Sequence, residues 1–294
     1  MSGDSGYGLS QVEGAKEMAA PELAYLPRLP EGYRPKIGLI GCGGISEYHL
    51  AAYKALGLEV VALCDAAEDR AEARRAAFFP SATVTADYRE VLARNDVDVI
   101  DAATHPEERV AIVDAALRAK KHVLSQKPFV TDLHEGMRLA DLADEMGVKL
   151  AVNQNGRWAP HFAYIRRAIE AGLLGEVSTA DFSLQWDHTW VAGTPFDELH
   201  HLVLHDFAIH WFDIVTAFFG EREATSVSAR IAQRSKQVTK PPILAHVLIE
   251  YPNGQATMSF NAHVKHGQQD ATTVCGEHGT IRSGGPSLSE QPVT

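Results

Sequence analysis

The stretch KIGLIGCGGIS, residues 36–46, decides the fold of this 294-residue chain. An apolar run at 37–40 has the character of a buried strand. Three glycines follow it: Gly41, Gly43 and Gly44. Glycines let the chain turn tightly and let a ligand approach the backbone where a Cβ would intrude, and the predicted helix 49–55 offers its N-terminus to an anion. The stretch therefore predicts a pyrophosphate cradle, although Ser46 occupies the place of the fingerprint's third glycine.

The composition is that of a soluble globular protein, with 45% hydrophobic and 22% charged residues. The formal net charge of −11 argues against a nucleic-acid partner. No apolar run has the length of a membrane span and no signal peptide is evident, so we expect a cytoplasmic protein with no membrane partner. The three cysteines, Cys42, Cys64 and Cys275, are too few and too scattered for a disulfide framework and are predicted to be small buried fillers.

Strand and helix patterns alternate between residues 36 and 152, which predicts a doubly wound parallel sheet. The predicted strands are 37–40, 58–63, 82–84, 97–102, 122–125 and 149–152, and the predicted helices are 49–55, 69–79, 88–93, 107–120 and 133–146. Residues 1–34 are polar and then punctuated by prolines, and we interpret them as an N-terminal extension lying over the domain. Residues 35–153 are predicted to form the dinucleotide-binding domain.

After Asn153 the rhythm changes, and residues 154–294 are assigned to a second domain. The predicted helices there are 159–171 and 202–219, and the predicted strands are 176–186, 224–232, 243–251 and 255–262. The last three strands are expected to be consecutive and antiparallel, because Tyr251-Pro-Asn-Gly-Gln255 has the composition of a tight turn.

Asp65 stands at the end of the second predicted strand. A carboxylate there can accept hydrogen bonds from the adenosine ribose and repel a 2′-phosphate, although it can equally cap the helix that follows. Neither Ala66 nor Ala67 supplies a positive charge, so the predicted cofactor is NAD rather than NADP.

Lys127 follows the fifth predicted strand and precedes Pro128. Ligands of open parallel sheets bind outside the carboxyl ends of the strands, which places this lysine to face the reactive end of a cofactor. The alternative is an ordinary surface lysine in a turn.

Asp206 and His210 share a face of the predicted helix 202–219, because they stand four residues apart. A carboxylate beside an imidazole can hold one tautomer and stabilise the protonated form, and an imidazole suits proton transfer with an alcohol near neutral pH. The pair predicts a general base with an orienting partner, although a core histidine with a structural aspartate has the same spacing.

The region around this helix is rich in histidine, with His188, His200, His201, His205 and His210. His201 and His205 have the spacing of a zinc pair, but no glutamate follows His201, so we expect no metal. Aromatic and polar residues also gather here, namely Trp186, Asp187, His188 and Trp190. They can cover the apolar faces of a pyranose or be core aromatics at a strand end.

In their order these motifs resemble the Gfo/Idh/MocA family of NAD(P)-dependent oxidoreductases, from about Lys36 to Gly284. The matching segments are GCGGIS with His49, Cys64-Asp65 with Arg70-Ala71, Ala103-Thr104 with Pro106, Lys121-His122-Val123, Gln126-Lys127-Pro128, Asn153-Gln154-Asn155 with Arg157-Trp158, Gly175-Glu176-Val177, Asp206 to His210 with Asp213, and Gly276 to Ile281. The resemblance implies a Rossmann domain joined to an α/β domain with an open, mostly antiparallel sheet, which often mediates homo-oligomer formation.

The resemblance, with the patterns above, implies three sets of site residues. The cofactor-binding set is Gly41, Gly43, Gly44, Ile45, Asp65, Arg70, Thr104, Pro106, Gln126, Lys127 and Asn153. The substrate-binding set is Arg157, Trp158, Trp186, His188, Asp206 and His210. The catalytic set is Lys127, His210 and Asp206, in which the first two meet the reacting hydroxyl.

The chain departs from the family pattern in four places. Gln126 replaces the usual glutamate before Lys-Pro, His201-Leu202 stands where Gly-Gly is common, and Arg109 replaces a usual histidine. The chain also stops at Thr294, where relatives usually continue, which suggests a truncated member.

The predicted function is hydride transfer between NAD(H) and a carbinol carbon of a sugar, cyclic polyol or glycoside. Two alternatives stay open. An NAD-retaining glycosidase of the same family would release free sugar without net NADH. A non-catalytic NAD(P)-binding regulator would bind NADH and turn over no polyol.

Overall fold

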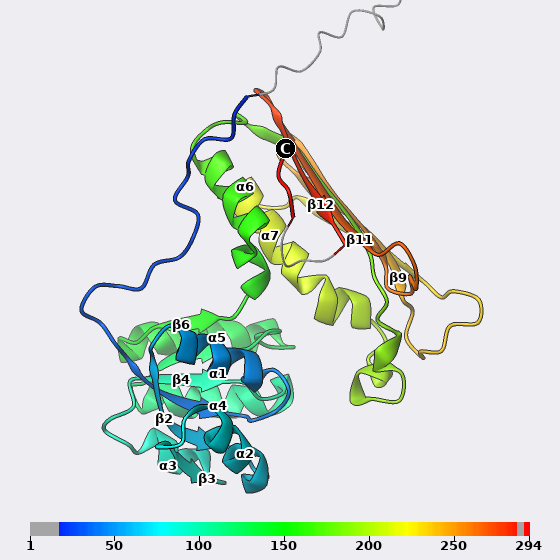
Figure 1. Cartoon of the computed structure of the whole chain (residues 1–294). Coiled ribbons are helices and arrows are strands. Elements are labelled where there is room, and N and C mark those ends of the chain that lie inside the picture. The colour runs from blue at the N-terminus through cyan, green and yellow to red at the C-terminus, as the bar shows by residue number, and fades with distance from the viewer. Residues whose placement is uncertain (1–17, 287–290) are drawn as a thin grey trace, which may run out of the picture.

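The computed structural model describes residues 18–286 and 291–294, which form two lobes, each built on a six-stranded sheet (Figure 1). The first sheet has the order β3-β2-β1-β4-β5-β6, and all its neighbouring strands are parallel. Its strands are β1 (Lys36–Ile40), β2 (Glu59–Cys64), β3 (Thr83–Thr85), β4 (Val99–Ala102), β5 (His122–Ser125) and β6 (Leu150–Val152). The helices of this lobe are α1 (Ser46–Ala55), α2 (Glu68–Phe78), α3 (Tyr88–Leu92), α4 (Pro106–Arg118) and α5 (Leu133–Met146). The predicted doubly wound sheet is confirmed.

The central strands of the first sheet are buried on both faces, as their continuous apolar runs predict. Leu39, Leu63 and Ile100 have no exposed surface. Cys42 and Cys64 are buried as predicted, whereas the third cysteine is only half-buried, and all three are unpaired thiols.

The second sheet has the order β12-β11-β7-β10-β9-β8. Its strands are β7 (Val177–Gln185), β8 (Ser226–Ala232), β9 (Leu244–Tyr251), β10 (Gly254–Asn261), β11 (Gln269–Gly276) and β12 (Thr280–Gly285). Only β7 and β10 are parallel neighbours, so the sheet is mixed and mostly antiparallel. The predicted turn between β9 and β10 is confirmed, and Asn253 adopts a φ of 61° in it, which asparagine tolerates. Sequence alternation does not predict β11 and β12, because their buried face carries the polar residues Asp270, Thr272 and Ser283.

One face of the second sheet is covered by α6 (Pro160–Glu170) and α7 (Ile209–Phe219), which lie side by side in Figure 1. Phe162, Trp211 and Phe218 anchor the two helices in a single apolar core with the inner face of the strands. This packing sets the position of the helix that carries the candidate base.

The predicted helix over 202–219 is present but is divided into two parts. A π-helical turn, η4 (Val203–Phe207), precedes α7, and within it the N–H of Ala208 donates to the carbonyl of Val203. Such turns often occur at functional sites. Three short 3₁₀ turns lie in the connections of this lobe: η1 (Asn155–Trp158), η2 (Thr189–Val191) and η3 (Pro195–Glu198).

The described part of the N-terminal extension spans both lobes. Figure 1 shows it running from the second lobe down to the start of β1. The Tyr164 hydroxyl of α6 donates to the Pro21 carbonyl at 3.0 Å, and the rings of Tyr25 and Tyr164 meet edge to face with centroids 5.7 Å apart. The extension is therefore anchored on the second domain before it enters the first. Residues 1–17 lie outside the described part.

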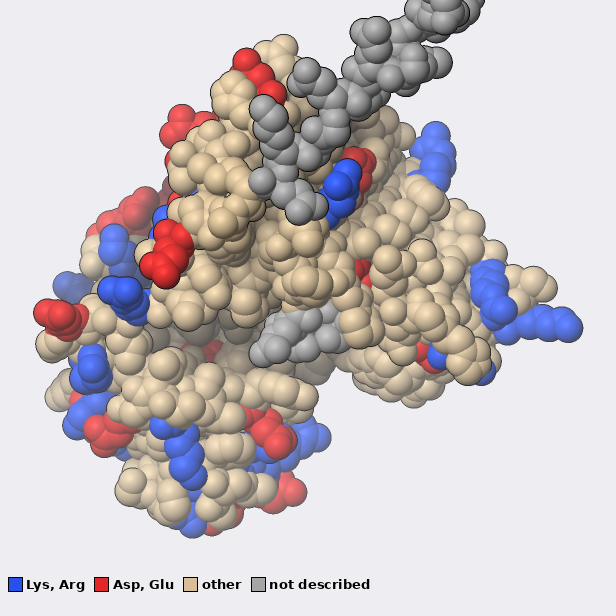
Figure 2. Space-filling model, turned by 45° about the horizontal axis from the view of Figure 1, so that its top comes forward, with Lys and Arg blue, Asp and Glu red and all other residues tan. Residues whose placement is uncertain are grey.

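The surface in Figure 2 carries Lys and Arg side chains interspersed with Asp and Glu side chains. Among the described residues of this face the basic groups do not form one continuous strip, in line with the net charge of −11. No helix within residues 18–286 and 291–294 is both long and apolar enough to cross a membrane.

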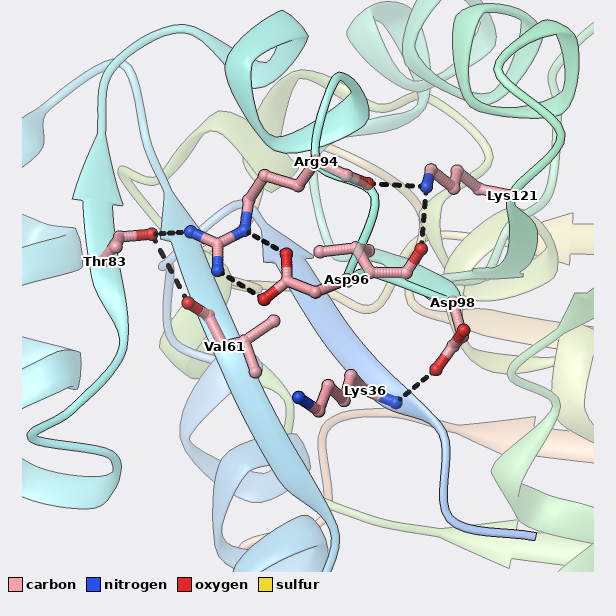
Figure 3. A network of polar contacts seen from close by, with 8 residues as sticks. Lys36, Val61, Thr83, Arg94, Asp96, Asp98 and Lys121 are labelled. Carbon is pink, nitrogen blue, oxygen red and sulfur yellow. Dashed lines mark hydrogen bonds and ion pairs between the residues drawn. The ribbon is translucent and has the colours of Figure 1, made fainter.

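A polar network ties the amino-terminal ends of the parallel strands together (Figure 3). The Lys121 ammonium donates to the carbonyls of Arg94 and Val97, at 2.7 and 2.8 Å. The Arg94 guanidinium in turn donates to Asp96 and to the hydroxyl of Thr83. The network lies at the opposite edge of the sheet from the glycine turn, so Lys121, one of the residues behind the family resemblance, has a structural role.

Replacing Lys121 with Met should lower the free energy of unfolding by about 2 kcal/mol, because two carbonyls lose a charge-assisted hydrogen bond. Urea denaturation measures the change. Lys149→Met is the matched control, since that side chain is exposed and makes no hydrogen bond to the described residues. Equal effects of the two substitutions would contradict the assignment.

Candidate functional site

The glycine turn that follows β1 has the geometry of an anion cradle. Gly41 has a φ of +99°, and a Cβ there would lie 2.8 Å from the carbonyl carbon of Ala103, so no larger residue fits. A Cβ at Gly43 or Gly44 would meet only open space. Among the described hydrogen bonds, none uses the N–H of Gly43, Gly44 or Ile45. These three donors therefore stay available at the start of α1 for a phosphate group.

The Asp65 carboxylate braces this turn. One oxygen accepts from the N–H of Cys42 at 2.8 Å, and the other accepts from the N–H of Ala67 at 2.9 Å. The second contact closes a local turn ahead of α2 and is not a helix cap, because the N-cap residue of α2 is Ala67 and has no side-chain cap hydrogen bond. Each oxygen keeps a further lone pair, so the same carboxylate can also accept from ribose hydroxyls.

Arg74, which was not predicted as a site residue, reaches the glycine turn from α2. Its guanidinium donates to Glu47 at 2.8 Å and to the Gly43 carbonyl at 3.3 Å, whereas Arg70 is exposed. Arg70 and Arg74 differ by one helical turn. Sequence reasoning had no signal to choose between them.

Asn153, at the end of β6, is held by a buried network that begins in α1. Its side-chain amide lies 3.0 Å from His49 Nε2, and His49 Nδ1 lies 2.7 Å from Asp101. Tyr53 donates a second hydrogen bond to Asp101 at 2.8 Å. Nearby in sequence, the buried hydroxyl of Thr104 has no hydrogen-bond partner among the described residues. A polar ligand at this edge of the sheet would give that hydroxyl a partner.

Lys127 reaches across to the second lobe. Its ammonium donates to a carboxylate oxygen of Asp206 at 2.9 Å and to the carbonyl of Asp206 at 3.0 Å. The backbone N–H of Lys127 donates to the side chain of Gln126 at 2.7 Å. The structure thus pairs Asp206 with Lys127, a contact that the spacing of Asp206 and His210 did not indicate.

His210 lies beside this pair, and its Nδ1 has no hydrogen-bond partner among the described residues. Burial, and then the Lys127 charge, lower the pKa of His210 to about 4, while Asp206 opposes the shift. The ring packs directly on η1, where a Cβ on Gly156 would lie 3.0 Å from His210 Cβ. Gly156 therefore leaves the room for the imidazole, a role that sequence reasoning missed although the residue lies between two predicted site segments.

A small apolar hollow lies in the wall of the second domain, beside Trp211, which follows His210 in α7. It is lined by Leu184, Trp186, His188, Val203, Phe207, Trp211, Phe260, Asn261 and Ala262. Trp186 and His188 stack with ring centroids 5.5 Å apart, and the His188 ring lies 3.8 Å from that of Phe207. Burial lowers the pKa of His188 to about 4. The predicted pair Trp186 and His188 thus lies at this hollow, together with Phe207 and Trp211, which were not predicted.

The other two predicted substrate residues have partners of their own. Arg157 forms a bidentate ion pair with Asp213 of α7, with Nε 2.6 Å from one oxygen. Trp158 is 48% exposed, and the Arg166 guanidinium lies 5.2 Å from its ring centroid. The Arg157 pair anchors η1, and with it Gly156, to the helix that carries His210.

The histidine cluster stands apart from this geometry. His200, His201 and His205 are exposed, and the last two rings stack at 6.2 Å. No group of three or more potential metal ligands occurs within residues 18–286 and 291–294.

Family sequence models match both lobes. One, described as "Oxidoreductase family, NAD-binding Rossmann fold", covers residues 35–154, and another, described as "GFO/IDH/MocA C-terminal domain", covers residues 162–282. The chain belongs to the Gfo/Idh/MocA family. The resemblance seen in the sequence motifs is confirmed, and the glycine turn of this family member is the cradle of an NAD-binding domain.

Curated relatives include the D-apiose dehydrogenase of Paraburkholderia graminis, 27% identical over 256 residues that cover 85% of this chain and 67% of that protein. The inositol 2-dehydrogenase of Rhizobium meliloti is 25% identical over 252 residues, covering 84% of this chain and 74% of that one. The solved WlbA dehydrogenase from Bordetella pertussis, in complex with NADH and UDP-GlcNAcA, has a TM-score of 0.75 at 23% identity and shows the shared fold. It covers 88% of this chain and 82% of its own. This family member spans about two thirds of the length of the apiose dehydrogenase.

Proposed function

We propose that this protein transfers a hydride between NAD(H) and the carbinol carbon of a sugar or cyclic polyol. The observation that carries the proposal is the meeting of Lys127 from the Rossmann domain with Asp206 and His210 from the second domain. The names of the apiose and inositol dehydrogenases support the same class of reaction. NAD, when bound, accepts or supplies the hydride, and the protein supplies geometry and electrostatics.

Lys127 is proposed to stabilise the substrate oxygen. An ammonium carries three N–H donors, and Asp206 occupies two of them. The third is left for the reacting hydroxyl, where a fixed positive charge favours the alkoxide character that develops as hydride departs. Asp206 therefore acts in this proposal by holding Lys127 in place as well as by its charge beside His210.

His210 is proposed to accept the hydroxyl proton. Because its pKa lies at about 4, the imidazole is neutral at pH 7 and has a free lone pair. The positive charge of Lys127 disfavours the imidazolium form of His210, and the negative charge of Asp206 favours it. The site can therefore take up a proton without creating an isolated buried charge.

The aromatic side chains around the hollow, with His188 close to Lys127 and Asp206, support a ring-shaped polyol as substrate. Flat aromatic faces cover the C–H surfaces of such rings. Three buried ring nitrogens there lack partners among the described residues: those of Trp186 (Nε1), His188 (Nδ1) and Trp211 (Nε1). The hollow itself has room for about one water molecule, so the substrate ring would lie against the exposed edge of this aromatic wall rather than inside it.

We further propose a cytoplasmic homo-oligomer. The unpaired thiols of Cys42, Cys64 and Cys275 suit a reducing compartment. The homo-oligomer is supported by the family resemblance, because the open sheet of the second domain often mediates association in this family.

A screen of NAD reduction across sugars, inositols and glycosides tests the function. NADH should form with at least one ring polyol, and kcat/KM for NAD should exceed that for NADP by about tenfold or more, because Asp65 loses its ribose hydrogen bonds to a 2′-phosphate. Equal values for the two cofactors would contradict the role of Asp65. Free sugar without net NADH would indicate the glycosidase alternative, and NADH binding without any turnover would indicate a regulator.

His210→Ala should lower kcat by about 10²- to 10⁴-fold and leave the NADH dissociation constant unchanged, because His210 belongs to the second domain. The wild-type kcat/KM should hold from pH 7 to about 5 and fall as the free enzyme's base titrates near 4. The acidic limb should flatten in the variant. His278→Ala, in the exposed turn between β11 and β12, is the matched control. Loss of both kcat and NADH affinity would make His210 structural instead.

A further inference from the structure

Arg109 is an arginine almost completely enclosed in the Rossmann domain, with 2% of its surface exposed. It stands in the first turn of α4, whose N-terminus follows the loop after β4. Among the described residues, its guanidinium donates only to backbone carbonyls, those of Thr104, Gln126 and Pro128. Thr104 belongs to the loop after β4, and the other two belong to the loop after β5, so one side chain joins the two loops.

Two of the three acceptors flank the candidate catalytic lysine. Gln126 immediately precedes Lys127 and Pro128 immediately follows it, and the same terminal nitrogen of Arg109 contacts both carbonyls. The Gln126 N–H is also tied to β4, through the Ala102 carbonyl at 3.1 Å. The backbone of Lys127 is therefore fixed on both sides before its side chain extends toward Asp206.

Burial removes the Arg109 guanidinium from water, which costs free energy. No carboxylate among the described residues offsets that cost by pairing with it. No ion pair to Arg109 occurs among them, and burial alone lowers its pKa to about 10. The guanidinium remains charged at neutral pH. A buried charge without a counter-charge is expensive, whereas an apolar side chain of similar volume would avoid that cost. Such an apolar side chain would leave the three carbonyls without these donors.

We propose that Arg109 is a positioning residue, which clamps the loop on both sides of Lys127 so that the Lys127 ammonium reaches the reacting oxygen. The planar fork of a guanidinium can hold several carbonyls at once in fixed directions, which the single ammonium of a lysine cannot do. The link to turnover rests on the proposed function. The clamp itself does not, because it predicts a measurable property of the loop in the absence of any substrate.

Hydrogen exchange of the full-length protein tests the clamp directly. Amides in the segment 125–130 should exchange about tenfold faster or more in Arg109→Ala, whereas those in β9 and β10 should be unchanged. Arg118→Ala is the matched control, because Arg118 lies on the same helix, is exposed and, within the described part of the chain, pairs only with Asp114. Unchanged exchange in 125–130 would overturn the proposal, whatever the outcome of the substrate screen.

Turnover supplies the second readout. With a substrate identified, Arg109→Ala should lose about 10- to 100-fold in kcat with little change in KM, the scale of a small misplacement of a reacting group. Guanidinium at tens of millimolar should restore part of the loss in Arg109→Ala and leave the rate of Arg118→Ala, which should match the wild type, unchanged. A role confined to stability would shift the melting temperature without this rescue.

Arg109→Lys keeps the proposal testable if the alanine variant does not fold. It retains the charge but not the fork, so it should fold and still show faster exchange in 125–130 and a reduced kcat. Wild-type exchange and turnover in Arg109→Lys would overturn the proposal, since charge alone would then suffice.

Discussion

The ion pair between Lys127 and Asp206 is the contact on which the rest of the site depends. It joins the loop after β5 to the π-helical turn before α7, with 2.9 Å between the ammonium and the carboxylate. Both side chains are less than a fifth exposed, so solvent screens them less than it screens a surface pair. The pair brings the carboxyl edge of the parallel sheet, where ligands of this fold bind, against the wall that carries His210.

The two domains contribute opposite kinds of chemistry to this meeting point. The Rossmann side supplies the charges of Lys127, Asp65 and the buried Arg109, together with the open N–H groups of the glycine turn. The second domain supplies neutral imidazoles, whose pKa values burial lowers, and aromatic rings around a small hollow. Charge stabilisation and proton acceptance are thereby placed on separate rigid supports, and a polyol ring can lie between them.

The sequence predicts the Rossmann domain well because its strands are continuous apolar runs and its turn is marked by glycines. It predicts the second domain less completely. Strand β11 buries Asp270 and Thr272, so it lacks the alternation of apolar and polar residues by which a strand is predicted. A π-helical turn interrupts residues 202–219, whose apolar pattern predicts one helix. In the site, i,i+4 spacing suggested that Asp206 serves His210, but no local rule reveals a lysine 79 positions away. The role of Arg109 was hidden too, because its partners are backbone carbonyls that carry no sequence signal.

A double-mutant cycle on Lys127 and Asp206 tests the central claim most directly, because the account gives the two residues one shared task. The kcat of NADH formation is measured for the wild type, Lys127→Met, Asp206→Asn and the double variant, with the NADH dissociation constant measured for each. The account predicts that the double variant is about as slow as Lys127→Met alone, since Asp206 acts chiefly by holding that ammonium. Independent losses that multiply in the double variant would contradict it.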